Sequence, residues 1–341
     1  MAMTVPEDTR TRPILCLLFL LCGLFLPAMI PAARAGDDFH FITISDIPYS
    51  AKENYVLTQS LAPAIIKDDA PFVVHMGDFK NSSISCTAAL MTERRNQIVA
   101  LHPGRVFYTP GDNDWADCDR EEIPERFSKL NRLDLLRRLF YSTSMNLPPE
   151  WQFARQNLYP ENMRWTYKNV VFATVHMVST NNGRLEILLD DPTLALDLID
   201  ARDQADLRWL YHSFGAAVQQ NARAIVIATQ ADVTRIKFTP PCSVTLRQKC
   251  DAFTFFRRAI ALLAKEFKKP VLLVHGDTHP YCLDKTFGGK EAPNLWRFNS
   301  TGDYSFVDAV RVTVDPENKA APFAFLSLMR HLPPRSTCKA G

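Results

Sequence analysis

Acidic side chains follow several short apolar segments of the sequence. The stretch VHGDTHPY at 274–281 places Asp277 and His279 directly after an apolar run. The same position after an apolar run is taken by Asp46, Asp78, Asp112 and either Gln230 or Asp232. One such aspartate is commonly a turn former or a helix cap, but carboxylates gathered at one rim repel each other unless cations balance them. The pattern therefore predicts a metal site, with Asp277 and His279 among its ligands.

The apolar runs are typical of buried strands separated by amphipathic helices. Strands are expected at 39–46, 71–78, 105–112, 169–177, 223–232 and 269–277, and helices at 55–67, 124–141, 203–220 and 251–267. This alternation predicts an α/β architecture, in which ligands collect at the C-terminal ends of the strands. Strands at 295–300, 307–315 and 322–328 follow without helices, as if a meander completed a second sheet.

Composition limits the class of protein. The 341 residues are 47% hydrophobic, which is ample for a core. A net charge of +2 gives no electrostatic footprint for a nucleic acid partner. No repeat or flexible linker interrupts the sequence, so one domain is expected over 36–341, and its oligomeric state is left open. The segment from 179 to about 203 is expected to be an insertion that covers the site, or else an ordinary connecting loop.

The first residues have the pattern of a secretory signal peptide. Arg10 and Arg12 precede the apolar stretch 14–30, and Ala33 and Ala35 supply the small residues that a signal peptidase reads. We expect cleavage after residue 35, which would leave a periplasmic or secreted chain without a transmembrane segment. The alternative is an uncleaved membrane anchor, and Pro27 and the small residues count against it.

The cysteines indicate an oxidising compartment. Six of them follow residue 35, and an even number in an exported chain predicts disulfides. Cys242 with Cys250 would close a short loop, and Cys86 with Cys118 would join two segments that each follow a strand-end motif. The remaining two are Cys282 and Cys338. The alternative is that some are free buried thiols, whereas the lack of a C-x-x-C pair or Cys/His cluster argues against a zinc–thiolate site.

The order of the strand-end motifs resembles that of the calcineurin-like metallophosphoesterases. That family shows D-x-H, G-D, G-N-H-[DE], a lone histidine and G-H-x-H along a four-layer α/β/β/α sandwich. The matching residues here are Asp46-Ile47-Pro48, Gly77-Asp78, Gly111-Asp112-Asn113-Asp114, Gln230 and Gly276-Asp277-Thr278-His279. Five motifs in register with five expected strands, over nearly the whole mature chain, are a fairly specific signal. The resemblance implies that sandwich fold.

The resemblance also implies a site for two divalent metal ions. Carried over residue by residue, the ligands of one ion are Asp46, Asp78 and His279, and those of the other are Asp78, Asp112, Gln230 and Asp277, so that Asp78 bridges the ions. The sequence departs from the family motif at Pro48, Asp112, Gln230 and Asp277. Because three imidazoles are lost and oxygen donors remain, we expect manganese, magnesium or calcium in preference to zinc or iron.

The departures also affect the expected proton donor. The family's histidine in G-N-H aligns with Asn113, whose amide can donate a hydrogen bond but cannot deliver a proton. Asn113 and Asp114 are therefore the candidate catalytic residues. Asp114, His275 or His176 could supply the proton, the leaving group could be undemanding, or the reaction could be slow. A shift of the motif by one residue is a further alternative, in which Asn113 is a metal ligand and Asp114 is the acid.

The function that the resemblance implies is an exported phosphoester hydrolase that uses two metal ions to activate water. Tyr49, Lys80 and Asn81 lie beside the motifs and are candidates for contact with a small-molecule or lipid phosphoester. The alternative for Lys80 is a solvated loop residue. Two further functions stay open: a non-enzymatic relative that binds a metal or ligand, and a structural domain whose calcium site is saturated by protein ligands.

Overall fold

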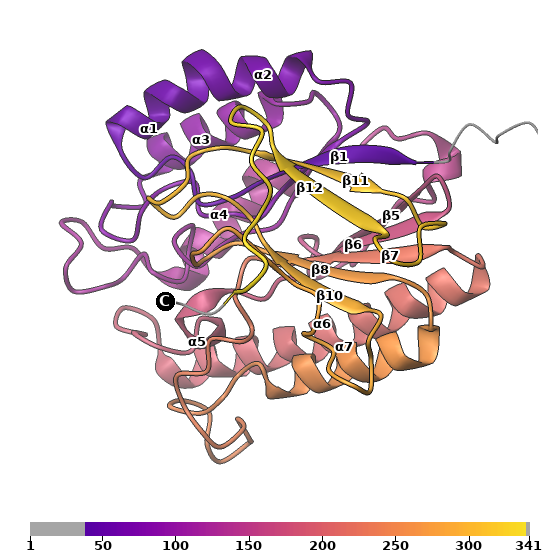
Figure 1. Ribbon diagram of the computed structural model, residues 1–341. Helices are drawn as coiled ribbons and strands as arrows, with labels where there is room; N and C mark the ends of the chain where they lie inside the picture. The colour runs from indigo at the N-terminus through magenta and orange to yellow at the C-terminus, as the bar shows by residue number, and fades with distance from the viewer. Residues whose placement is uncertain (1–37, 339–341) are drawn as a thin grey trace, which may run out of the picture. The chain divides into compact units, whose positions relative to one another are not determined.

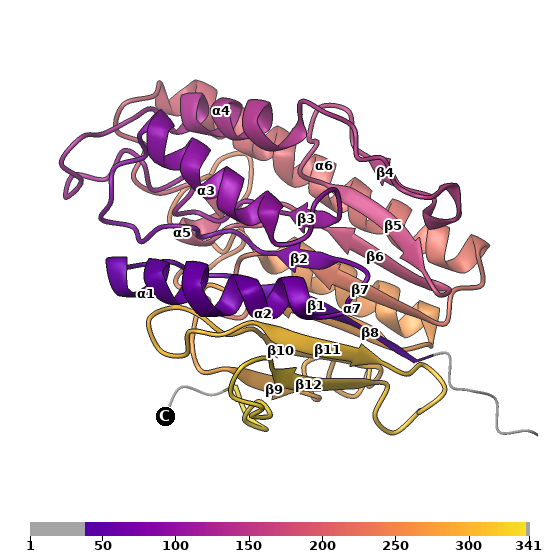
Figure 2. The same ribbon diagram turned by 90° about the horizontal axis from the view of Figure 1, so that it is seen from above.

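Two β-sheets form the centre of the structure, a computed structural model that describes residues 38–338. The first sheet has the order β12-β11-β1-β2-β3 and the second has the order β4-β5-β6-β7-β8-β10-β9 (Figure 2). The strands of the first sheet are β1 (Phe39–Ile44), β2 (Val73–His75), β3 (Val106–Tyr108), β11 (Val310–Val314) and β12 (Phe323–Ser327). The strands of the second are β4 (Ala154–Arg155), β5 (Met163–Tyr167), β6 (Val170–Thr174), β7 (Ala224–Ala228), β8 (Val271–His275), β9 (Cys282–Asp284) and β10 (Leu295–Asn299).

The central strands of each sheet are parallel, so their C-terminal ends lie along one edge. In the first sheet β1, β2 and β3 run parallel, and the register pairs Ile44 with His75 and His75 with Tyr108. In the second sheet β6, β7, β8 and β10 run parallel. The outer strands β11, β12, β5, β4 and β9 pair antiparallel with their neighbours. This arrangement brings the loops after the parallel strands together, as expected for a ligand site.

Helices cover the outer face of each sheet (Figure 1). A continuous helical segment of α1 (Ala51–Val56), the π-helical turn η1 (Leu57–Leu61) and α2 (Ala62–Lys67) packs on the first sheet, and α3 (Ala88–Ala100) and α4 (Lys129–Tyr141) pack on each other. The second sheet is covered by α6 (Pro192–Gln219) and α7 (Thr254–Phe267). The short elements are η2 (Pro149–Trp151) and α5 (Ser179–Asn182). The predicted four-layer α/β/β/α sandwich is confirmed.

Aromatic side chains fill the space between the two sheets. Phe107 of β3 stacks on Trp165 of β5 with 3.5 Å between ring centroids. Phe41 of β1 meets Phe172 of β6 edge-on at 5.2 Å. Each buried aromatic removes a large apolar area from water and adds a favourable ring–ring contact. These contacts fix the two sheets against each other and therefore fix the relative positions of the loops at their ends.

The structure differs from the expected elements in several places, and β4, β5 and β9 have no counterpart among the expected strands. Helix α3 was not expected from the sequence, because only Met91 and Ile98 of its side chains are buried and the apolar pattern is weak. The segment after residue 179 is not all loop, since α6 already begins at Pro192, where the side chain of Asp191 caps it by accepting from the Leu194 N–H. The last three strands are divided between the sheets: β10 joins the second, and β11 and β12 complete the first.

Three disulfides tie loops to the framework. They join Cys86 with Cys118, Cys242 with Cys250, and Cys282 with Cys338. The first two are the pairings expected from the sequence. Disulfides are typical of proteins in oxidising compartments. The signal peptide predicted for residues 1–35 lies outside the described residues, and within 38–338 no helix is long and apolar enough to cross a membrane.

Candidate metal centre

Three of the predicted aspartates occupy the same unusual backbone position. Asp46 after β1, Asp78 after β2 and Asp277 after β8 have φ angles of 56°, 57° and 71°. Few residues other than glycine adopt this left-handed conformation, and aspartate is one that tolerates it. Glycines allow the close approach of these turns: a Cβ on Gly276 would overlap a carboxylate oxygen of Asp46, and one on Gly111 would overlap a carboxylate oxygen of Asp78.

The turns bring carboxylates from both sheets together. One oxygen each from Asp78, Asp112 and Asp277 lies within 4.8 Å of the others, and we call these three residues the carboxylate cluster. Asp46 is adjacent to it, because the Asp277 N–H donates to both Asp46 oxygens at 3.0 and 3.1 Å. Asp277 Oδ2 is buried and has no hydrogen-bond partner of normal geometry among the described residues, although the nearby Ser179 side chain opposes the rise in the pKa of Asp277. An unpaired buried carboxylate oxygen is costly, and a cation would satisfy it.

Burial makes ionisation of these groups unfavourable. It raises the pKa of Asp46 to about 7 and that of Asp277 to about 7. Burial and the charge of Asp277 raise the pKa of Asp112 to about 6. The pKa of Asp78 is well above its ordinary range because of burial and the charges of Asp112 and Asp46. A bound divalent cation would reverse these effects, since it stabilises the ionised carboxylates.

Tyr49 and Asn113 lie within the same group of side chains. The Tyr49 hydroxyl is 3.1 Å from Asp46 Oδ1 and 3.1 Å from Asp78 Oδ2, and it accepts a hydrogen bond from Asn113 Nδ2 at 3.1 Å. The Asn113 backbone N–H donates to Asp78 Oδ1 at 3.1 Å. Both residues also line a cavity of about 560 Å³ into which the carboxylate cluster opens. The structure thus places the predicted substrate contact Tyr49 and the predicted catalytic residue Asn113 beside the cluster.

Asp114 faces the protein interior. Its carboxylate accepts from the backbone N–H groups of Asp78, Phe79 and Gly111 at 3.0, 2.9 and 2.8 Å, and from the Tyr108 hydroxyl at 2.8 Å. The side chain is fully buried. These bonds tie the loop after β2 to the loop after β3. The position is that of a residue that orders the site, although the sequence indicated a proton donor.

Lys80 and Asn81 are not among the residues that line the cavity. Lys80 is fully buried, and its ammonium group donates to the backbone oxygen of Asn81 at 3.1 Å. Burial lowers the pKa of Lys80, and the charges of Asp114 and other aspartates oppose that effect. Asn81 Nδ2 donates to the backbone oxygen of Tyr49 at 2.6 Å. Asn81 therefore supports the Tyr49 loop, and Lys80 is a buried residue and not a solvated loop residue.

Two further predicted ligands differ in placement. The Gln230 side chain lies against the carboxylate cluster, with Nε2 2.9 Å from Asp78 Oδ2, 3.0 Å from Asp112 Oδ1 and 3.4 Å from Asp277 Oδ1. His279 does not join the cluster: its side chain is 66% exposed, and Nδ1 lies 3.0 Å from a carboxylate oxygen of Asp303. Asp232 pairs with Arg297 at 2.8 Å and belongs to a separate ion pair.

Sequence reasoning missed a polar wall of the cavity. Thr180 Oγ1 lies 2.7 Å from Asp112 Oδ2 and 2.7 Å from Asp117 Oδ1. Arg120 donates to Thr180 Oγ1 at 3.1 Å and pairs with Asp117 and Glu186 at 3.0 and 2.6 Å. No sequence motif indicates this contact, because it joins segments that are 60 residues apart. In the sequence, Thr180 belongs to the stretch STNNG at 179–183, where the expected insertion begins.

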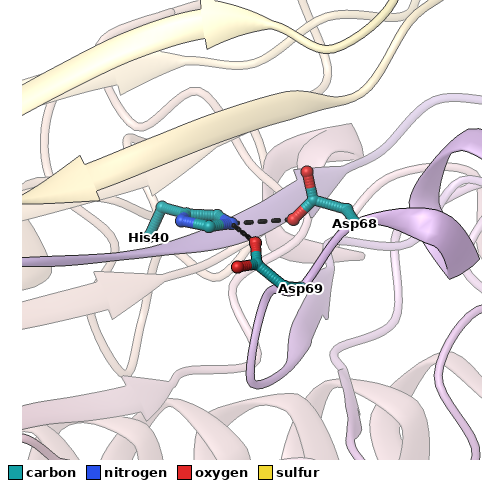
Figure 3. Close-up of side chains that lie close together, drawn as sticks. All are labelled: His40, Asp68 and Asp69. Carbon is teal, nitrogen blue, oxygen red and sulfur yellow. Dashed lines mark hydrogen bonds and ion pairs between the residues drawn. The ribbon is translucent and has the colours of Figure 1, made fainter.

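A second cluster of potential ligands lies at the start of β1 (Figure 3). His40 Nε2 is 2.7 Å from Asp68 Oδ1 and 3.2 Å from Asp69 Oδ1. Asp68 also pairs with the Arg311 guanidinium. Burial raises the pKa of Asp68, but the hydrogen bonds from His40 and Arg311 lower it further than burial raises it. The positive partner is already supplied by Arg311, so we interpret this cluster as a structural ion pair between α2, β1 and β11.

Comparisons with known proteins agree with this fold. No protein-family model matches the chain, and no curated protein does. Among solved structures, PhoD aligns over 84% of this chain and 65% of its own, with 15% identity and a TM-score of 0.50. Purple acid phosphatase PPD1 from yellow lupin (Lupinus luteus) seeds aligns over 88% of this chain and 54% of its own, with 10% identity and a TM-score of 0.44.

GAP50, the anchor in the inner membrane complex of Plasmodium, aligns over 89% of this chain and 90% of its own, with 10% identity and a TM-score of 0.42. The chain thus spans less than two thirds of the length of PhoD and of the lupin enzyme. At these identities the likeness concerns the fold alone. The likeness to PhoD agrees with the order of motifs in the sequence, and the chain has a metallophosphoesterase-type fold.

Proposed function

We propose that this protein is an exported, metal-dependent phosphoester hydrolase. The observation that carries the proposal is the carboxylate cluster of Asp78, Asp112 and Asp277, which opens into the cavity and contains a buried oxygen that no described residue bonds with normal geometry. Carboxylate oxygens are the ligands that manganese, magnesium and calcium prefer. The donor set lacks imidazole and thiolate, so zinc and iron are less suited to it.

A second cation would be held by Asp46 and Asp78, with Asp78 shared between the two positions. The Tyr49 hydroxyl lies 3.1 Å from both Asp46 Oδ1 and Asp78 Oδ2, so these two carboxylate oxygens are close enough to share one partner. His279 would have to leave Asp303 to contribute. Bound cations supply positive charge for phosphate oxygens and lower the pKa of water.

Side chains of the cavity would bind and orient a small phosphoester. Asn181 lines the cavity, and its buried Nδ2 has no hydrogen-bond partner among the described residues. It is therefore a ready donor to a phosphate oxygen. Arg120 lines the same wall and adds positive charge. Asn113 cannot deliver a proton, and Asp114 already accepts four hydrogen bonds, so we expect substrates with a leaving group of low pKa, such as a phenol.

Export is supported by the three disulfides and by the signal-peptide pattern of residues 1–35. The periplasm or the medium outside the cell is the proposed location.

A second candidate function is a non-enzymatic relative that binds a cation or ligand. It is favoured by the protein donors that already contact the carboxylates, namely Tyr49, Thr180 and Gln230. In that case the cluster would be satisfied largely by the protein, and cation binding would have no associated turnover.

The test is hydrolysis of an aryl phosphate monoester and diester by purified protein that is stripped of metal and then given manganese, magnesium, calcium or zinc. The variant Asp78→Asn removes the shared carboxylate. We expect turnover to return with an oxygen-preferring cation and to fall at least about a hundredfold in Asp78→Asn.

Asp134→Asn is the matched control, because Asp134 lies on the exposed face of α4 and, among residues 38–338, forms an ion pair with Arg138 alone. It should retain full activity. Cation binding without turnover in the wild type would favour the non-enzymatic function, and equal turnover in wild type and Asp78→Asn would refute the proposed site.

A further inference from the structure

The Gln230 amide has an orientation that its surroundings determine. Gln230 follows β7 and is fully buried. The backbone N–H of Ser179 donates to Oε1 at 2.8 Å. Because a backbone N–H can only donate, the atom that faces it must be the carbonyl oxygen. The NH₂ group is then the end that faces Asp78, Asp112 and Asp277.

The opposite orientation is unfavourable in this environment. Turning the amide over would place its NH₂ group against the Ser179 N–H, so two donors would face each other. It would also place Oε1 against three carboxylate oxygens. Both contacts would leave buried polar groups without partners, which costs more than an ordinary hydrogen bond contributes.

The Ser179 N–H is itself held in place. Ser179 precedes Thr180, Asn181 and Asn182, which have left-handed φ angles of 53°, 55° and 57°. Helix α6 holds this turn, because Arg202 donates to the Asn182 backbone oxygen at 2.6 Å and Asn182 Nδ2 donates to Asp203 at 2.6 Å. The backbone N–H that orients Gln230 therefore belongs to a turn whose position is held by hydrogen bonds to α6.

We infer that Gln230 is a resident hydrogen-bond donor that competes with a cation for the carboxylate cluster, and that it is not a ligand of that cation. The inference rests on the cation site of the proposed function. It replaces the role that the sequence predicted for Gln230, because the amide hydrogens point toward the oxygens that the cation would bind. A cation must displace these N–H groups, so the cluster binds it more weakly than the carboxylates alone would.

The test is a calorimetric titration of Mn²⁺ into metal-stripped wild type and Gln230→Met. Methionine keeps the length of the side chain and removes both the donor and the amide oxygen. We expect Gln230→Met to bind Mn²⁺ about tenfold more tightly or better, which is the effect of removing competing hydrogen bonds to charged groups. Weaker binding in this variant would show that Gln230 is a ligand and would overturn the inference, as would the absence of binding in both proteins.

Two controls accompany the titration. Gln59→Met, on the exposed face of η1, should leave the affinity unchanged. Asp277→Asn in the Gln230→Met background should abolish binding, which locates the titrated site in the cluster.

A second variant keeps the inference testable if Gln230→Met does not fold. Ser179→Pro removes the N–H that orients the amide, so Gln230 can turn its oxygen toward the cation, and we expect tighter Mn²⁺ binding than in Ser179→Ala, which removes only the hydroxyl that interacts with Asp277. Unchanged or weaker binding would contradict the inference. Turnover of the wild type is measured separately. Loss of turnover with the expected affinities would refute only the hydrolase, whereas weaker binding in an active enzyme would refute only the role of Gln230.

Discussion

Tyr49 lines the cavity and also contacts the carboxylates of the candidate metal centre. Its hydroxyl is shared between Asp46 and Asp78 and is itself bonded by Asn113. Burial and the nearby aspartates keep the pKa of Tyr49 well above its ordinary range, so the hydroxyl stays protonated and remains a donor. A hydroxyl in this position offsets part of the repulsion between two buried carboxylates.

Tyr49→Phe should therefore destabilise the protein in the absence of metal. We expect the free energy of unfolding in chelator to fall by about 1–3 kcal/mol, which is typical of a buried polar group that loses its hydrogen-bond partner. Urea denaturation measures the difference. Tyr304→Phe is the matched control, since that side chain is 61% exposed, and an equal loss in both variants would contradict the role assigned to the Tyr49 hydroxyl.

At this scale the sequence predicted residue types better than residue roles. The aspartates after β1, β2, β3 and β8 could be predicted because each follows an apolar run and a parallel strand ends there. The directions in which the side chains point could not be predicted. Asp114 faces backbone N–H groups and Gln230 presents its nitrogen to the carboxylates, and both depend on partners that are distant in sequence. Thr180 and Arg120 reach the cavity through such long-range contacts as well.

The loops after the strands depend on close backbone approach. Gly276, directly after β8, leaves room for Asp46 and Ser45 of the opposite sheet. Gly276→Ala should push Asp46 away from Asp277, with a loss of turnover of about tenfold or more, because overlap in a packed site forces such a shift. Turnover with Mn²⁺ and circular dichroism of the variant would measure activity and fold.

Gly215→Ala is the matched control for that change. Gly215 lies within α6, and a Cβ there meets no atom within 4 Å. This variant should keep full turnover and gain about 0.5–1 kcal/mol in stability, since alanine favours a helix over glycine. Full activity in Gly276→Ala would contradict the close packing of the two loops.

Most elements were predictable because their apolar residues form a continuous run or repeat with a clear period. The parallel strands β2, β6, β7 and β8 are buried runs, and α7 has a helical period that buries one continuous face. Helix α3 has few buried side chains, and the first turns of α6 contain exposed leucines such as Leu194 and Leu198. Where an element contributes little to the core, its sequence pattern is weak. The pairing of β11 with β1 depended on tertiary packing and had no local signal.

The buried aspartates link the stability of the whole molecule to pH. The pKa of Asp277 is about 7 in the fold because of burial, and its ordinary value is 3.8. A raised pKa contributes stability that is present below 3.8 and is lost as the pH rises toward 7. Buried histidines oppose this trend, because burial lowers the pKa of His176 to about 4 and that of His75 to about 3. Both histidines are present in the wild type and in an aspartate variant, so their contribution cancels when the unfolding free energies of the two proteins are subtracted.

Asp277→Asn in chelator should therefore gain stability relative to the wild type as the pH rises from 5 to 7.5. We expect the difference in unfolding free energy to grow by about 2 kcal/mol over that range. Urea denaturation at each pH measures it, with Asp134→Asn as the control. A difference that stays constant with pH would show that Asp277 is ionised throughout, and added Mn²⁺ should reverse the sign of the trend.

The antiparallel partner of β1 is β11, which pairs Phe39 with Val314 and lies near the other end of the chain. Ribosomes make roughly 5–20 residues per second, so β1 waits on the order of 10 to 50 seconds before residues 310–314 exist. During that time one side of β1 presents free backbone N–H and C=O groups. A nascent chain stopped before residue 310 cannot complete its first sheet, so premature termination should lead to aggregation and chaperone capture instead of a smaller folded product.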